Sequence, residues 1–150
     1  MVDEYRKRLA ECGFSHQLTF ELVDEKSHPL FLVFGTGSDH GVEKMKDAMW
    51  HVDPGSGSHF RDPRDPNQIA FDLSDSAPDL RVLRNQILDS LKEGPRSLAD
   101  LQRFALLETI FKGTHATAVV KGLEADHLVE ARHARAHSDY EVRLAPPTLF

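Results

Sequence analysis

Apolar positions at helical spacing predict three short helices in the second half of the chain. The first covers residues 80–91 and is ended by the Gly-Pro pair at 94–95. The second begins at Ser97, a good helix-capping residue, and the third covers 116–126 after a break at Gly113-Thr114. The predicted core positions of the three helices are Leu80, Leu83, Ile87, Leu88 and Leu91; Leu98, Leu101, Phe104, Ala105 and Leu107; and Val119, Val120 and Leu123.

Two strands are predicted after the third helix. The first covers 128–133, and a polar turn at 137–139 follows it. In the second strand Tyr140, Val142 and Leu144 alternate with charged residues, as in a strand with one buried face. Three short helices followed by a hairpin predict a winged helix-turn-helix. The alternative is a generic three-helix domain with a trailing hairpin.

The N-terminal part predicts a helix and a β-hairpin. A helix over 3–12 ends at Gly13, and alternating apolar residues over 17–22 predict a strand with one buried face. After a polar turn at 24–29, the run Leu30–Phe34 is apolar at every position, which is typical of a strand covered on both faces. Two strands and one helix cannot cover such a strand, so the cover must come from the winged helix, a second copy or a missing domain.

A further helix and a long loop follow the hairpin. The helix is predicted from Val42 to about His51, with Ser38 or Asp39 as its N-cap. Residues 53–67 are rich in Gly, Ser, Asp and Pro and predict a loop, and a short edge strand is expected over 69–73.

The predicted fold class is α+β, with a helix–β-hairpin–helix segment followed by a winged helix-turn-helix. The predicted division is a first segment over 1–54, a loop and linker over 55–79, and the winged helix over 80–145.

Charge is distributed unevenly along the chain. The net charge is −6; residues 1–75 hold 8 Lys and Arg against 14 Asp and Glu, whereas 76–150 hold 10 of each. The second half is therefore neutral and lacks the basic surface of a strong DNA binder. The single cysteine, Cys12, and the lack of an apolar span or signal peptide predict a soluble cytoplasmic protein with no membrane contact.

Candidate DNA contacts lie on the third helix and the wing, because the start of this helix enters the major groove in helix-turn-helix proteins. The candidates on the helix are Lys112, Thr114, His115, Thr117 and Lys121. The candidates on the wing are Arg132, His133, Arg135 and His137. The weak charge leaves protein docking, or a passive capping role, as an equal alternative.

Other chemistry finds little support in the sequence. The glycines at 35, 37 and 41 precede a helix but match neither a dinucleotide fingerprint nor a P-loop, so a flexible turn is favoured over nucleotide binding. The histidines near the wing do not share one face, and no cysteine accompanies them as a metal ligand. No nucleophile and base are paired. We therefore expect neither a cofactor nor a metal, and no enzymatic activity.

Two stretches, Pro29–Pro54 and the winged helix, resemble the C-terminal part of the three-Cys-motif partner proteins, called TcmP. The resemblance covers nearly the whole chain. It implies a tail attached to a methyltransferase-type α/β domain, acting with a radical-SAM-type three-cysteine partner protein. The α/β core of that family is absent from these 150 residues, which implies a binding, docking or dimerisation role, with a homodimer through Leu30–Phe34 as one form.

Overall fold

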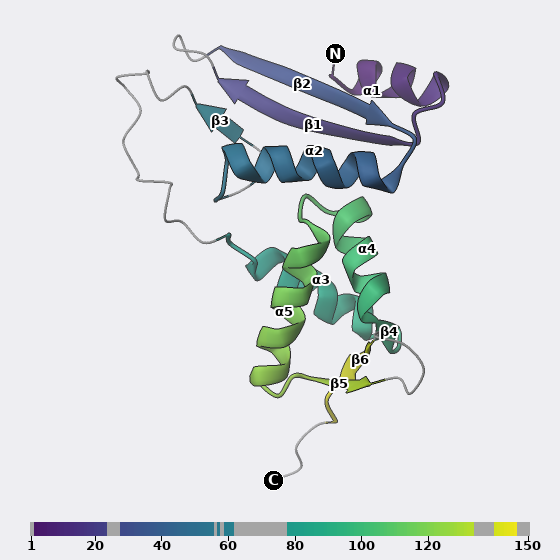
Figure 1. Cartoon of the computed structure of the whole chain (residues 1–150), viewed down its shortest axis with the longest axis vertical. Coiled ribbons are helices and arrows are strands. Elements are labelled where there is room, and N and C mark those ends of the chain that lie inside the picture. The colour runs from purple at the N-terminus through teal and green to yellow at the C-terminus, as the bar shows by residue number, and fades with distance from the viewer. Residues whose placement is uncertain are drawn as a thin grey trace. The chain divides into compact units, whose positions relative to one another are not determined.

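The computed structural model describes residues 2–23, 28–55, 57, 59–61, 78–133 and 140–146 (Figure 1). The chain divides into two compact units, Met1–Asp79 (the N-terminal unit) and Leu80–Phe150 (the winged-helix unit). Both combine helices with a small sheet, which confirms the predicted α+β class. None of the described helices is long and apolar enough to cross a membrane.

The N-terminal unit is a three-stranded sheet with helices. Its elements are α1 (Val2–Glu11), β1 (His16–Val23), β2 (Pro29–Thr36), α2 (Asp39–Val52) and β3 (His59–Arg61). The strand order is β2-β1-β3; β1 and β2 are antiparallel, with Leu18 opposite Phe34, and this confirms the predicted hairpin. Gly13 has φ 93°, the left-handed conformation expected after a helix.

The two long strands carry a helix on each face (Figure 1). A Cβ built on Gly35 would lie 3.1 Å from Cγ of Phe14 and 3.4 Å from Cδ1 of Leu9, so Gly35 faces α1. A Cβ on Gly41 of α2 would overlap the side chain of Thr36. Neighbouring residues of a strand point to opposite faces, so α1 and α2 cover opposite faces of the sheet.

The strand β2 is not covered as the sequence predicted. Leu30, Phe31 and Leu32 remain 56%, 49% and 46% exposed, although the apolar run predicted burial on both faces. The physical reason is position: β2 is an edge strand, and the contact of α1 with it lies at the Gly35 end. The buried apolar core of the unit lies instead around Phe20 of β1 and the inner side of α2.

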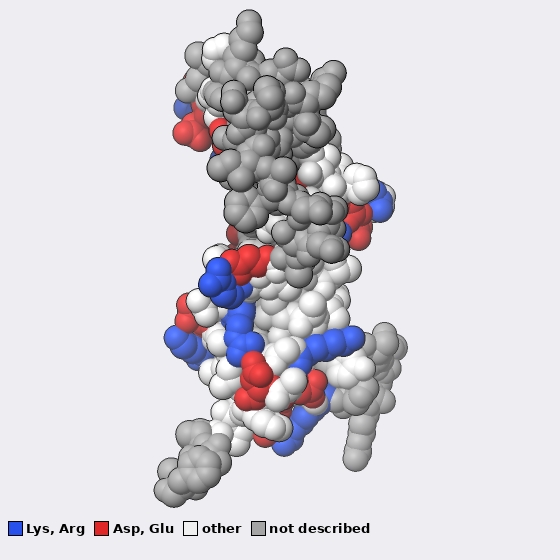
Figure 2. Space-filling model, turned by 90° about the vertical axis from the view of Figure 1, so that its left-hand side faces the viewer, with Lys and Arg blue, Asp and Glu red and all other residues white. Residues whose placement is uncertain are grey.

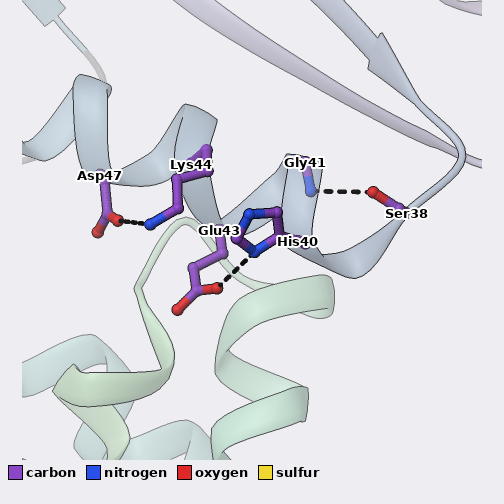
Figure 3. A network of polar contacts seen from close by, with 6 residues as sticks. All are labelled: Ser38, His40, Gly41, Glu43, Lys44 and Asp47. Atoms are coloured by element: carbon purple, nitrogen blue, oxygen red, sulfur yellow. Dashed lines mark hydrogen bonds and ion pairs between the residues drawn. The ribbon is translucent and has the colours of Figure 1, made fainter.

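The start of α2 is fixed by a side-chain cap. Ser38 Oγ accepts a hydrogen bond from the Gly41 N–H at 3.1 Å, which confirms Ser38 as the N-cap (Figure 3). The helix is longer than predicted, because it starts at Asp39 directly after this cap. Figure 3 also shows exposed pairs on α2, His40 with Glu43 and Lys44 with Asp47.

The predicted loop over 53–67 is wrong in part. Strand β3 lies within it and pairs in parallel with β1, Leu22 opposite Phe60. Three residues are too few to show an alternating pattern, so this strand could not be predicted from its residues alone. The predicted edge strand over 69–73 lies outside the described residues.

A lysine lies on the buried side of α2. Lys46 is 1% exposed and shares this side with Val42, Met49 and Trp50. Burial disfavours the ammonium form, and it lowers the pKa of Lys46 from 10.5 to about 8.

This lowered pKa predicts a pH-dependent stability. The unfolded chain holds the Lys46 proton more tightly than the folded chain, so the free energy of unfolding rises as pH increases from 8 towards 10.5. We expect a rise of about 2 kcal/mol between pH 7.5 and 10 from this group. Urea unfolding followed by the fluorescence of Trp50, the single tryptophan, measures it. Lys46→Met should lack this contribution; an equal pH dependence in both proteins would contradict the account.

The helices and strands of the winged-helix unit follow one another in the order expected for a winged helix-turn-helix. Its elements are α3 (Arg81–Leu91), β4 (Arg96–Ser97), α4 (Leu98–Glu108), α5 (Gly113–Ala125), β5 (Val129–His133) and β6 (Tyr140–Leu144). The sheet order is β4-β6-β5, with Arg96 opposite Val142. Strand β4, which lies directly before α4, pairs with β6 of the hairpin. The hairpin is therefore part of this domain, as a wing, and is not a trailing segment.

The predicted stripes form most of the core of this unit, but five predicted core residues are only half-buried: Leu80, Leu88, Leu98, Phe104 and Leu107. Successive turns of the three helices contribute the buried apolar residues, and 6% is the largest exposure among them. These are Leu83, Ile87, Leu91, Leu101, Ala105, Phe111, Ala116, Val119, Val120, Leu123, Val129 and Val142. The predicted cap is also present, since Ser97 Oγ accepts from the Asp100 N–H at 3.0 Å.

The turn between α4 and α5 lies earlier than predicted. The Thr109 hydroxyl donates to the Ala105 carbonyl at 2.6 Å and accepts from the Phe111 N–H at 3.0 Å, which ends α4. Phe111 is 3% exposed and anchors the turn in the core. Helix α5 then begins at Gly113, so the predicted break at Gly113-Thr114 is wrong.

Candidate nucleic-acid interface

Helix α5 occupies the position of a recognition helix and is held against α4 by a side-chain hydrogen bond. Gln102 Nε2 on α4 donates to Thr117 Oγ1 on α5 at 2.8 Å, and both groups are partly buried. The hydroxyl oxygen of Thr117, a predicted DNA contact, therefore lies in the interface between the two helices. The sequence did not reveal this pair, because the two residues are 15 positions apart.

His115, another predicted contact, caps the start of α5. Its Nδ1 accepts from the Lys112 N–H at 3.4 Å, and its ring stands edge-on to Phe111 with centroids 6.0 Å apart. The imidazole is half-buried, and its hydrogen bond fixes the first turn of α5, where Lys112 and Thr114 lie. His115 thus has a positioning role in this structure.

The outer surface of α5 carries one lysine among small residues. Thr114, Ala118, Lys121 and Gly122 are all exposed. No hydrogen bond or ion pair connects Lys121 with any described residue. Its ammonium group is therefore available to an outside anion such as a phosphate.

The base of the wing is an ion-pair cluster. Arg143 Nε donates to Glu130 Oε2 at 3.0 Å, and Arg132 Nη2 lies 3.7 Å from the same oxygen. The hydrogen bond from Arg143 holds the pKa of Glu130 below its ordinary value, and the charges of both arginines act in the same direction. The ionised Glu130 offsets part of the positive charge that Arg132 brings to the wing. The sequence offered a signal for this pair, because Glu130 and Arg143 lie opposite each other in the hairpin.

Three predicted wing residues cannot be placed. His133 belongs to β5, but its side chain lies outside the described part of the structure, as do Arg135 and His137 entirely.

The winged-helix unit is close to neutral. Its described residues include nine Lys and Arg and eight Asp and Glu. Several of these charges neutralise one another, as in the contact of Arg84 Nη2 with Asp126 Oδ2 at 2.8 Å. On the face drawn in Figure 2, Lys and Arg side chains lie next to Asp and Glu side chains. The described surface of this unit therefore offers individual cations to a phosphate, not a basic surface.

A shallow groove lies along α4, away from the predicted contacts. Its volume is about 280 Å³. It is lined by Arg96, Asp100, Arg103, Phe104, Leu107 and Glu108. Two cations and two anions line it, so its charges balance and it does not extend a phosphate-binding surface.

Nucleotide and metal chemistry remain without support in the described residues. The Gly41 N–H at the start of α2 already donates to Ser38, and the carboxylate of Asp39 lies in the first turn, which disfavours a phosphate there. Among the described residues, no group of three His, Cys, Asp or Glu side chains is placed to hold a metal ion.

Comparison with known proteins gives a family match. A family model described as "GMT-like wHTH domain" matches residues 60–134, half of the chain. No curated protein and no solved structure matches.

Proposed function

The chain belongs to the family of GMT-like wHTH domains, and we propose that it is a non-catalytic binding module whose winged helix contacts duplex DNA weakly. The observation that carries this proposal is Lys121, which is exposed on the outer surface of α5 and pairs with no residue in the part of the chain that the structure describes. In a helix-turn-helix this surface approaches the DNA.

The proposed contacts fall into two groups. Lys112, Thr114 and Lys121 act from α5, and Arg132 and Arg135 act from the wing. His115 and Thr117 hold α5 in place through their contacts with Lys112 and Gln102. A small number of phosphate contacts on a neutral domain supports modest affinity and little sequence preference. We place the module in the cytoplasm.

A charge-reversal variant tests this proposal. Lys121→Glu combined with Arg135→Glu should weaken binding to a labelled duplex at least about tenfold at low salt, because two phosphate contacts become repulsive. Fluorescence anisotropy measures the affinity.

The matched control is Lys92→Glu. Lys92 is an exposed lysine after α3 and forms an ion pair with Asp89 at 2.6 Å, so its reversal changes the net charge as much as Lys121→Glu alone, without touching α5. It should bind as the unchanged protein does. Equal affinity of the unchanged chain, the double variant and Lys92→Glu for the duplex would contradict the proposal of DNA binding.

A second candidate function is an accessory role beside a larger protein. The resemblance to the three-Cys-motif partner family and the exposed apolar residues of β2 favour it. In this role the chain would complete the sheet of a methyltransferase-type protein, or dock a three-cysteine radical-SAM-type partner. Binding of such a protein to the chain, abolished by a charged residue at Leu32, would support it over DNA contact.

A further inference from the structure

The outer edge of β2 lacks the features that normally protect a sheet edge. Residues 29–36 include no charged side chain, and the proline stands at the first position. The pairing with β1 runs without a bulge, from His16 opposite Thr36 to Val23 opposite Pro29. Lysines, central prolines and bulges usually prevent edge strands from pairing with other chains. Among the described strands only β1 pairs with β2, so its other edge is open to pairing.

The helices cover this strand unevenly. Pro29 to Leu32 are exposed, whereas Val33 to Thr36 are half-buried. The covered end is where Leu9 and Phe14 approach Gly35. The apolar side chains of residues 29–32 are therefore exposed to solvent, whereas residues 33–36 lie beside side chains that can also cover a neighbouring strand.

We infer that β2 pairs antiparallel with β2 of a second copy of this chain, around a two-fold axis at Leu32. Leu32 then lies opposite Leu32 of the second copy, and Leu30 lies opposite Phe34 of the second copy. Residues directly opposite in an antiparallel pair share one face, so apolar side chains meet apolar side chains along the ladder. The two sheets form one, in the order β3-β1-β2-β2-β1-β3.

This register brings the exposed half of each strand beside the covered half of the other. On the α1 side, Phe31 lies opposite Val33 of the second copy and diagonal to its Gly35. The Phe14 ring lies over Gly35 and is itself 38% exposed, so it is free to cover Phe31 of the other copy. Both exposed rings thereby lose water contact in one step.

The balanced charge beside this edge allows a second copy as the occupant. Helix α1, which flanks the edge, has three acidic and three basic residues, so two copies brought together do not repel. These are Asp3, Glu4 and Glu11, and Arg6, Lys7 and Arg8. One strand and its flanking helix form a small interface, so we expect a dissociation constant on the order of micromolar.

The test is the mass of the full chain in solution, measured by sedimentation equilibrium from low micromolar to near-millimolar concentration. A reducing agent is needed because Cys12 is exposed. The unchanged chain should shift from monomer to dimer. Leu32→Lys and Leu32→Glu should each be monomeric, because like charges would lie directly opposite. Mixing these two variants should restore a dimer, because position 32 then pairs opposite charges.

The matched control is Val52→Lys, which introduces the same charge at a 43% exposed apolar residue of α2 and should still dimerise. Trp50 fluorescence shows that each variant is folded. A chain that stays monomeric at all concentrations overturns the inference, as does a dimeric Leu32→Lys or a mixture that fails to associate. The result is independent of DNA binding, since the winged-helix unit carries those contacts.

Discussion

Replacing Leu123 with alanine is expected to lower the free energy of unfolding of the winged-helix unit by about 3–4 kcal/mol. Leu123 is 0% exposed at the inner side of α5, and its carbonyl accepts from the Leu128 N–H at 2.9 Å where the chain turns into the wing. Truncation leaves a cavity where the helices and the wing meet. Urea unfolding followed by far-ultraviolet circular dichroism measures the change.

The control for this variant is Leu128→Ala. Leu128 is 43% exposed, so the same truncation five residues later should cost less than about 1 kcal/mol. Equal destabilisation by the two variants would contradict the assigned core.

Gly57→Ala is expected to destabilise the N-terminal unit by about 2–4 kcal/mol. Gly57 has φ 65°, and a Cβ there would lie 2.6 Å from Cδ2 of Trp50. Trp50 is 5% exposed, so the indole has little room to shift. Urea unfolding followed by Trp50 fluorescence reports on this site directly.

Gly37→Ala serves as the control, because an added Cβ there meets no atom within 4 Å. We expect its free energy of unfolding to stay within about 0.5 kcal/mol of the unchanged chain. An unaltered stability of Gly57→Ala would show that Trp50 is not packed against this glycine.

The winged helix was predictable because its information is local. Apolar stripes located all three helices, and Ser97 marked the start of α4 by its capping chemistry. Alternation between Tyr140 and Leu144 located β6. The predicted start of α5 is too late because the Thr109 hydroxyl ends α4 before Gly113, the predicted break.

Other features depend on partners that are distant in sequence. Strands β3 and β4 are too short for a pattern and exist through their pairing with β1 and β6. The apolar run of β2 predicted its strand but not what covers it. Lys46 did carry a signal, because it lies four residues after Val42 on the stripe that continues to Met49 and Trp50.

The proposed DNA contacts show the same limit. Their places on α5 followed from the helix prediction, whereas their chemical roles did not. Thr117 and His115 proved to be engaged within the domain, and Glu130 offsets part of the charge of the wing. For Lys121, contact with DNA was predicted from the sequence and is still a proposal.

The most direct test of the central claim is fluorescence anisotropy of a labelled duplex titrated with the full chain at two salt concentrations. We predict binding at low salt that weakens as salt rises, with the shallow dependence of about four phosphate contacts at most. No binding at low salt, or binding that does not change with salt, would contradict a winged helix that contacts the DNA backbone through Lys121.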